Sequence, residues 1–168
     1  MFGNTRFEDL GDLYVEEIKD VYDAEHRILD ALPKMADKAN DDQLKQAFRS
    51  HLEETRGQVR RLEQVFSSLG IDPERKTCDA MKGLMSEGDE LLGAKGDGDV
   101  IDAALIGAAQ RVEHYEIAAY GTLRTLAREL GHEDQARLLQ QNLDEEGAAD
   151  EKLTRIAESR VNRKAVTA

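Results

Sequence analysis

The sequence contains little of what most other structural classes require. Its 168 residues include one cysteine, two prolines and no tryptophan, and only 5% of them are aromatic. A single cysteine, Cys78, cannot form an internal disulfide, which favours a reducing compartment. The scarcity of proline and of aromatic residues, beside abundant Ala, Leu, Glu and Arg, favours helices over sheets.

Long apolar runs and an excess of positive charge are also missing. No stretch approaches the length of a membrane span, and residues 1–6 do not begin a signal peptide. The formal net charge of -12 argues against the basic face that binding to nucleic acid or to anionic lipid requires. We therefore expect a cytoplasmic protein with no nucleic-acid partner and no membrane partner. Cations are the more natural ligands.

Apolar residues recur at spacings of three and four along most of the chain, which predicts an all-α protein with one domain over residues 1–168. Glycine, proline and cap-type residues mark the ends of the helices. The expected helices span about residues 9–39, 42–69, 77–94, 99–130 and 133–160. The basic tail, residues 160–164, is expected to fray.

The connection between the second and third long helices is too long for a simple up-down-up-down bundle, in which every loop is short. It contains the short helix at 77–94 and must run the length of the bundle. The third long helix then lies parallel to the second, which is the connectivity of ferritin-like folds. The expected fold is a ferritin-like four-helix bundle with a short extra helix in the crossover.

Acidic residues and one histidine occupy helix positions that should face a core. Buried carboxylates cost several kcal/mol each unless they are neutralised, and for such a cluster a metal ion is the commonest means. Four helices that each project a carboxylate at mid-length are the construction of a di-iron or di-manganese site. The candidate metal ligands are Glu25, His51, Glu54, Glu113, Glu116, Glu146 and Asp150.

The spacing within single helices supports this reading. His51 with Glu54, and Glu113 with Glu116, lie on adjoining turns and can each bind one ion. His51 can instead orient a neighbouring glutamate, and Asp150, at the edge of its stripe, is either a ligand or the partner of one. Oxygen-rich ligation suits iron(II) or manganese(II), whereas structural zinc favours cysteines.

Three segments carry a resemblance to a known family: Lys19–Glu25, His51–Thr55 and Ala109–Leu123. They are similar to the YciF-type ferritin-like stress proteins, and the resemblance runs from about Leu10 to about Lys164. It implies a ferritin-like bundle, a homodimer, an association with bacterial stress responses and a di-metal site.

The wider ferritin pattern places Glu-x-x-His on the second and fourth helices, and this sequence departs from it. Gly57 stands three positions after Glu54, and Ala149 three after Glu146, so the cluster can hold two ions, one or none. Two functions stay open. One is a stress-response protein that binds two Fe ions, with Mn as a substitute, and reacts with oxygen or peroxide. The other is a non-enzymatic helical stress protein that acts through partners and keeps its acidic core as a partly protonated network.

Overall fold

The computed structural model describes residues 6–167, and within this range every regular element is a helix. Residues 1–5 and residue 168 lie outside the described residues. The segment in which we expect no signal peptide, residues 1–6, therefore falls almost entirely outside them. The elements are α1 (Leu10–Lys38), α2 (Asp42–Ser68), α3 (Asp79–Gly93), α4 (Gly98–Glu129), α5 (Glu133–Ile156), the π-helical turn η1 (Ala157–Val161) and α6 (Asn162–Ala165).

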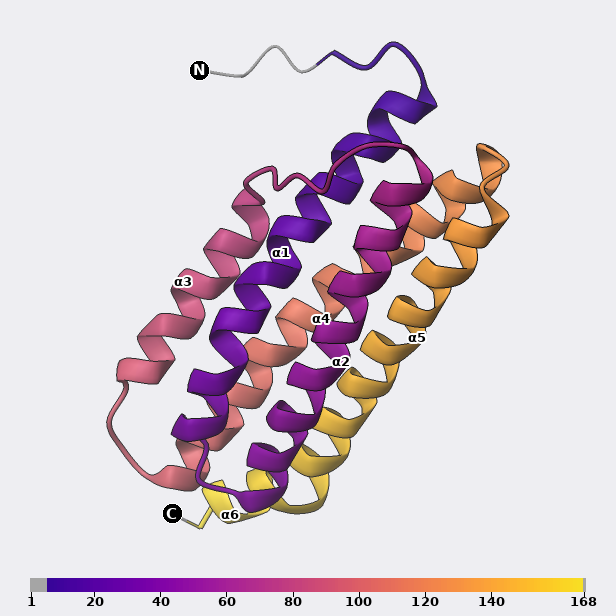
Figure 1. Cartoon of the computed structure of the whole chain (residues 1–168). Coiled ribbons are helices and arrows are strands. Elements are labelled where there is room, and N and C mark those ends of the chain that lie inside the picture. Colours follow the sequence, from indigo (N-terminus) through magenta and orange to yellow (C-terminus); the bar gives the residue numbers. More distant parts are fainter. Residues whose placement is uncertain (1–5, 168) are drawn as a thin grey trace.

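Four long helices, α1, α2, α4 and α5, form a bundle, and α3 lies beside α1 and α4 (Figure 1). The chain leaves α2 at one end of the bundle, returns along α3 to the other end and begins α4 there, so α4 runs parallel to α2 (Figure 1). This is the bundle with one long crossover that ferritin-like folds have. The all-α prediction and the extra helix in the crossover are confirmed.

Two apolar cores fill the two ends of the bundle. One joins the second halves of α1 and α5 to the first halves of α2 and α4, with Met81 of α3. The other joins the remaining halves and includes the fully buried Tyr14, Phe66 and Leu123. The middle of each long helix lies between these cores, and polar side chains at that level, such as Glu25 and Glu146, are buried. Any charged group at that level needs a partner from the protein or a ligand.

Short-range capping explains where the helices begin and end. The carboxylates of Asp9, Asp41 and Asp97 accept hydrogen bonds from backbone N–H groups in the first turns of α1, α2 and α4. Gly70 and Gly131 follow α2 and α4 with φ of 70° and 77°, a left-handed conformation that glycine adopts without steric cost. These signals place the observed ends close to the expected ones.

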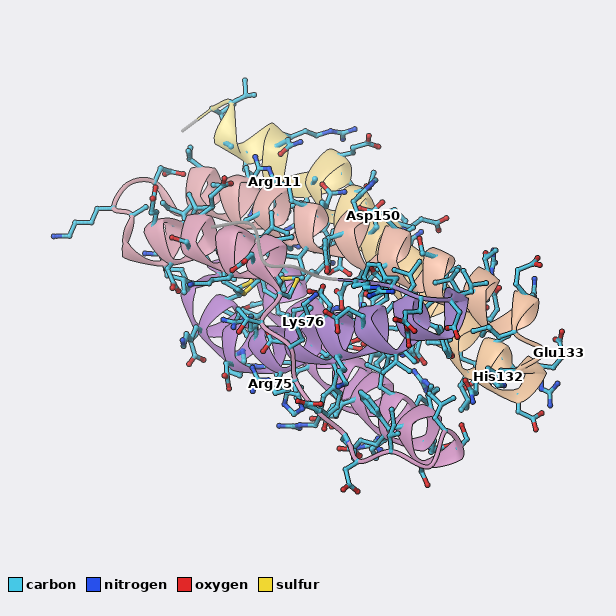
Figure 2. All side chains as sticks on the ribbon, turned by 90° about the horizontal axis from the view of Figure 1, so that it is seen from above. Arg75, Lys76, Arg111, His132, Glu133 and Asp150 are labelled. Atoms are coloured by element: carbon cyan, nitrogen blue, oxygen red, sulfur yellow. The ribbon has the colours of Figure 1, made fainter. Side chains whose placement is uncertain are left out.

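The connection before α3, which carries Arg75 and Lys76 (Figure 2), is fixed to α1 by ion pairs. Arg75 Nη2 lies 2.9 Å from Asp23 Oδ1, and Lys76 Nζ lies 2.7 Å from Glu16 Oε1. Burial alone would raise the pKa of Asp23, but hydrogen bonds from the Cys78 N–H and from two arginines lower it below its ordinary value. These contacts hold the first part of the crossover against the bundle.

The expectation of a frayed tail is wrong. The chain continues from α5 through η1 into α6, and its basic side chains reach acidic residues at that end of the bundle. Arg160 Nε lies 2.6 Å from Asp41 Oδ2, and Lys164 Nζ lies 3.7 Å from Asp99 Oδ1. Helical spacing does not reveal these ion pairs, because the acidic partners lie far from the basic tail in the sequence.

Replacing Asp41 by alanine tests the junction between α2 and the tail. We expect the free energy of unfolding to fall by about 1–2 kcal/mol, because the side chain caps α2 and is buried. Urea denaturation followed by circular dichroism measures this change. Arg160→Gln, the control, leaves the cap in place and should cost only about 0–1 kcal/mol, because the arginine is half-exposed and Lys164 Nζ still lies 3.9 Å from Asp41 Oδ2. An equal loss in both variants would contradict the capping account.

Candidate metal centre

Helix α1 contributes Glu25, whose side chain is fully buried. It lies on the same stripe as the core residues Val21 and Ile28, so the phase of the helix turns it inward. The hydroxyl of Tyr120 on α4 donates a hydrogen bond to Glu25 Oε1, while Oε2 has no hydrogen-bond partner among the described residues. Burial and the nearby charge of Glu146 raise the pKa of Glu25 to about 8.

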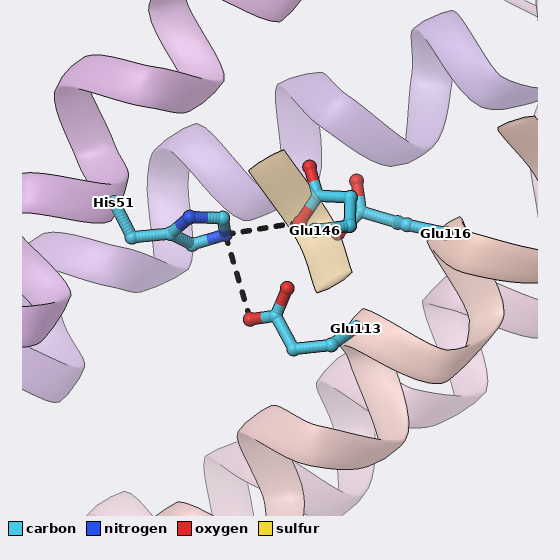
Figure 3. Close-up of side chains that lie close together, drawn as sticks. All are labelled: His51, Glu113, Glu116 and Glu146. Atoms are coloured by element: carbon cyan, nitrogen blue, oxygen red, sulfur yellow. Dashed lines mark ion pairs between the residues drawn. The ribbon is translucent and has the colours of Figure 1, made fainter. Parts of the chain in front are cut away.

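Helix α2 contributes His51, which faces two other helices at once (Figure 3). Its Nδ1 lies 3.2 Å from Glu54 Oε2, and its Nε2 lies 3.4 Å from Glu113 Oε1 and 3.5 Å from Glu146 Oε2. Thr55 donates its hydroxyl to the His51 carbonyl over 2.9 Å, so this threonine supports α2 itself. Burial alone would lower the pKa of His51, but Glu54 and Glu146 raise it above its ordinary value.

Helix α4 contributes Glu113 and Glu116, one turn apart, and α5 contributes Glu146 (Figure 3). All three are buried, and neither oxygen of Glu116 has a hydrogen-bond partner among the described residues. Gln58 on α2 donates its amide to Glu146 Oε1 and thereby fixes the orientation of that carboxylate. The other oxygen of Glu146 is left without a hydrogen bond and faces His51.

Four side chains therefore converge at mid-bundle: His51, Glu113, Glu116 and Glu146. Each offers one nitrogen or oxygen atom within 4.8 Å of the others. A buried carboxylate oxygen without a hydrogen bond costs free energy that a cation would recover. One imidazole with several carboxylates suits iron(II) or manganese(II), and the thiol of Cys78 belongs to a different part of the structure, beside Tyr115. The residues present thus fit a metal ion of this type.

The pKa values of the buried glutamates show that negative charge at this site is unfavourable when no cation is present. Burial raises the pKa of Glu113 to about 7, and it raises the pKa values of Glu116 and Glu146 well above the ordinary value for glutamate. The charges of Glu146 and Glu25 raise the pKa of Glu116 further. Without a cation, these carboxyl groups hold protons at pH values where free glutamate is ionised.

Three of the seven predicted ligands lie outside this four-residue cluster. Glu54 lies outside the four-residue group, its side chain is 42% exposed, and its hydrogen bond with His51 lowers its pKa. Asp150 lies further along α5 (Figure 2). It accepts a hydrogen bond from Gln110 over 3.0 Å and lies 3.4 Å from His114 Nε2. Glu25 is buried beside the cluster but outside its 4.8 Å group.

Three polar residues outside the candidate ligand set surround the cluster. Tyr120 and Gln58 donate hydrogen bonds to the buried Glu25 and Glu146. Asn142 is fully buried and accepts a hydrogen bond from Arg61. Position was the available signal, because Tyr120 lies four residues after Glu116 and Asn142 lies four before Glu146.

A cavity of about 230 Å³ between α2 and α5 reaches the cluster from outside. His51 and Glu113 line it, and Glu54 forms part of its wall. A water molecule needs only about 10–15 Å³ of such a volume, so the cavity can admit molecules much larger than water. This cavity is therefore an opening from the surface to the buried cluster.

The fold and this cluster define a class: a helical-bundle protein with a buried histidine–carboxylate group in ligand-like arrangement. Within that class, the chain belongs to the family described as a domain of unknown function (DUF892), whose model matches residues 9–166. Protein YciF of Escherichia coli strain K12 is 47% identical over 155 residues, which cover 92% of this chain and 93% of that protein. The resemblance to YciF-type proteins is confirmed.

Solved structures agree with this assignment. The Escherichia coli stress protein YciF matches with a TM-score of 0.89 and 45% identity, covering 93% of this chain and 99% of that one. YcfI of Rhodopseudomonas palustris, a proposed structural protein, matches with a TM-score of 0.87 and 48% identity, covering 91% and 98% of the two chains. A Xanthomonas campestris protein with a TM-score of 0.70 and 24% identity, covering 89% and 91%, shows the fold alone.

None of the helices in the described part of the chain combines the length and the apolar character that crossing a membrane requires.

The buried carboxyl groups predict how stability depends on pH in metal-free protein. The pKa of Glu25 rises from 4.5 to about 8 on folding, so between these values the folded state holds a proton that the unfolded chain has released. Stability therefore falls as pH rises through this window. We expect the melting temperature to fall by at least about 3 °C from about pH 5.5 to 8. A change of 1 kcal/mol in the free energy of unfolding corresponds to about 2–4 °C for a domain of this size.

Two variants check the source of this pH dependence. Glu25→Gln removes one titrating group and should flatten the dependence of the melting temperature on pH. Glu53→Gln changes an exposed residue of α2 that pairs with Arg56 and should leave the dependence as it is. A melting temperature that rises with pH in the unmodified chain would contradict the account.

Proposed function

We propose that this protein is a di-metal carboxylate protein of the bacterial stress response, with iron as its usual metal and manganese as a substitute. One observation carries the proposal: four buried ligand-type side chains offer atoms within 4.8 Å of one another, and several of their oxygens lack hydrogen bonds. Such an arrangement is costly in a protein without a cation and is accounted for by binding one.

In this proposal some residues bind the metal and others orient the residues that bind it. His51, Glu113, Glu116 and Glu146 would bind the first ion, and the free oxygen of Glu25 extends the set toward a second. Iron bound there would supply electrons to oxygen or peroxide. The protein keeps the carboxylates oriented through Gln58 and Tyr120, and the two apolar cores limit access of water.

Relatives support the physiological part of the proposal. The Escherichia coli protein YciF is called a stress protein, and it matches nearly the whole chain. A cytoplasmic location and a homodimer belong to the same proposal.

A second function has its own support. The raised pKa values of Glu25, Glu113, Glu116 and Glu146 allow a protonated network that needs no metal. The Rhodopseudomonas palustris relative is a proposed structural protein. In this alternative the chain acts through partners, and its acidic core serves only the fold.

Anaerobic titration with Fe(II) and Mn(II) separates the two functions. We expect binding to saturate near two ions per chain and the melting temperature to rise with metal concentration, because a ligand that binds only the folded state stabilises it. Calorimetry and thermal melting measure the two effects.

Matched variants locate the binding. Glu116→Gln should weaken metal binding at least about tenfold, because it removes a buried anionic ligand, while Glu53→Gln should bind like the unmodified protein. If neither metal changes the melting temperature while pH does, the metal proposal fails and the protonated network stands.

A further inference from the structure

The cavity that reaches the cluster has walls of two kinds. Its middle is apolar, formed by buried residues of α2 and α5: Ala47, Phe48, Ala149 and Leu153. Its outer part carries two cationic side chains, Lys152 and Arg155. A second, more open cavity of about 380 Å³ shares Ala47, Lys152 and Arg155 with the first. The two cavities therefore adjoin between α2 and α5, and together they are called the groove here.

The charges along this groove leave its mouth positive. Three glutamates line the inner cavity: Glu54 and Glu113 lie beside His51, and Glu145 is paired with Arg61. Lys152 forms no ion pair within 4.0 Å among residues 6–167, although its charge helps to lower the pKa of Glu54. The pair of Arg155 with Glu151, at 3.3 Å, is solvent-exposed and therefore weak. A positive mouth stands out in a chain with a net charge of -12.

The first cavity, the inner one that reaches the cluster, limits the size of the ligand that can bind there. Its volume of about 230 Å³ lies below the roughly 300–1,000 Å³ of sites for drug-sized molecules, and far above what peroxide or oxygen needs. Apolar walls with a few charged groups at one end are typical of sites for small amphipathic ligands.

We propose that this groove binds a small amphipathic monocarboxylate, with its hydrocarbon chain between Phe48 and Ala149 and its carboxylate between Lys152 and Arg155. The proposal rests on the proposed function only in that the inner end of the groove is the candidate metal centre. It places an organic anion in the groove that leads to that centre, with the carboxylate at the mouth of the groove and not at the metal.

Calorimetric titration of metal-free protein with octanoate tests this site directly. We expect one octanoate per chain, with octanol and octylamine binding at least about tenfold more weakly, because a charge-assisted contact with the mouth distinguishes the head groups. Using metal-free protein separates the two proposals. Octanoate binding without metal binding would overturn only the proposed function, and metal binding without octanoate binding would overturn only this inference.

Surface variants identify the groove. Lys152→Gln should weaken octanoate binding about tenfold and leave octanol binding nearly unchanged, whereas Lys34→Gln, an exposed lysine on α1, should have no effect. Ala148→Phe places a large side chain at an exposed position of the cavity wall and should block octanoate without disturbing the core. Equal binding of the three head groups, or octanoate binding unaffected by both Lys152→Gln and Ala148→Phe, would overturn the proposal.

Discussion

Burial of carboxyl groups midway along the bundle is the constraint on which the rest of the structure depends. Apolar cores at both ends leave the middle of each long helix with little water, and the side chains placed there are three glutamates and a histidine within ligand distance of one another. Desolvation and mutual repulsion then require either protons or a cation. The same residues thus determine how stable the metal-free chain is and what it can bind.

The crossover makes this arrangement possible. Because α3 returns the chain, α2 and α4 run parallel, and His51 comes to face Glu113 while α5 brings Glu146 to the same level. Hydrogen bonds from Gln58 and Tyr120 then restrict two of the carboxylates, as supporting contacts around metal sites do. The groove between α2 and α5 opens the cluster on one side. The same structure therefore buries the cluster and admits a ligand to it.

The sequence predicts most of the fold, since helix ends follow from local signals such as the Asp41 cap and Gly131 after α4. Inward phase also predicts the burial of Glu25, Glu113, Glu116 and Glu146. The spacing of residues along α2 could not show that Glu54 lies at the rim of the cavity, because side chains within one turn of a helix point in very different directions. Contacts between helices, such as Tyr120 with Glu25, depend on the rotation of one helix against another, which no single helix encodes.

Anomalous X-ray scattering at the manganese edge, from crystals grown with Mn(II), tests the central claim most directly. The account predicts metal peaks at mid-bundle, with the first ion bound by His51, Glu113, Glu116 and Glu146. Peaks only at surface carboxylates, or a mid-bundle cluster that stays without metal at saturating Mn(II), would contradict it.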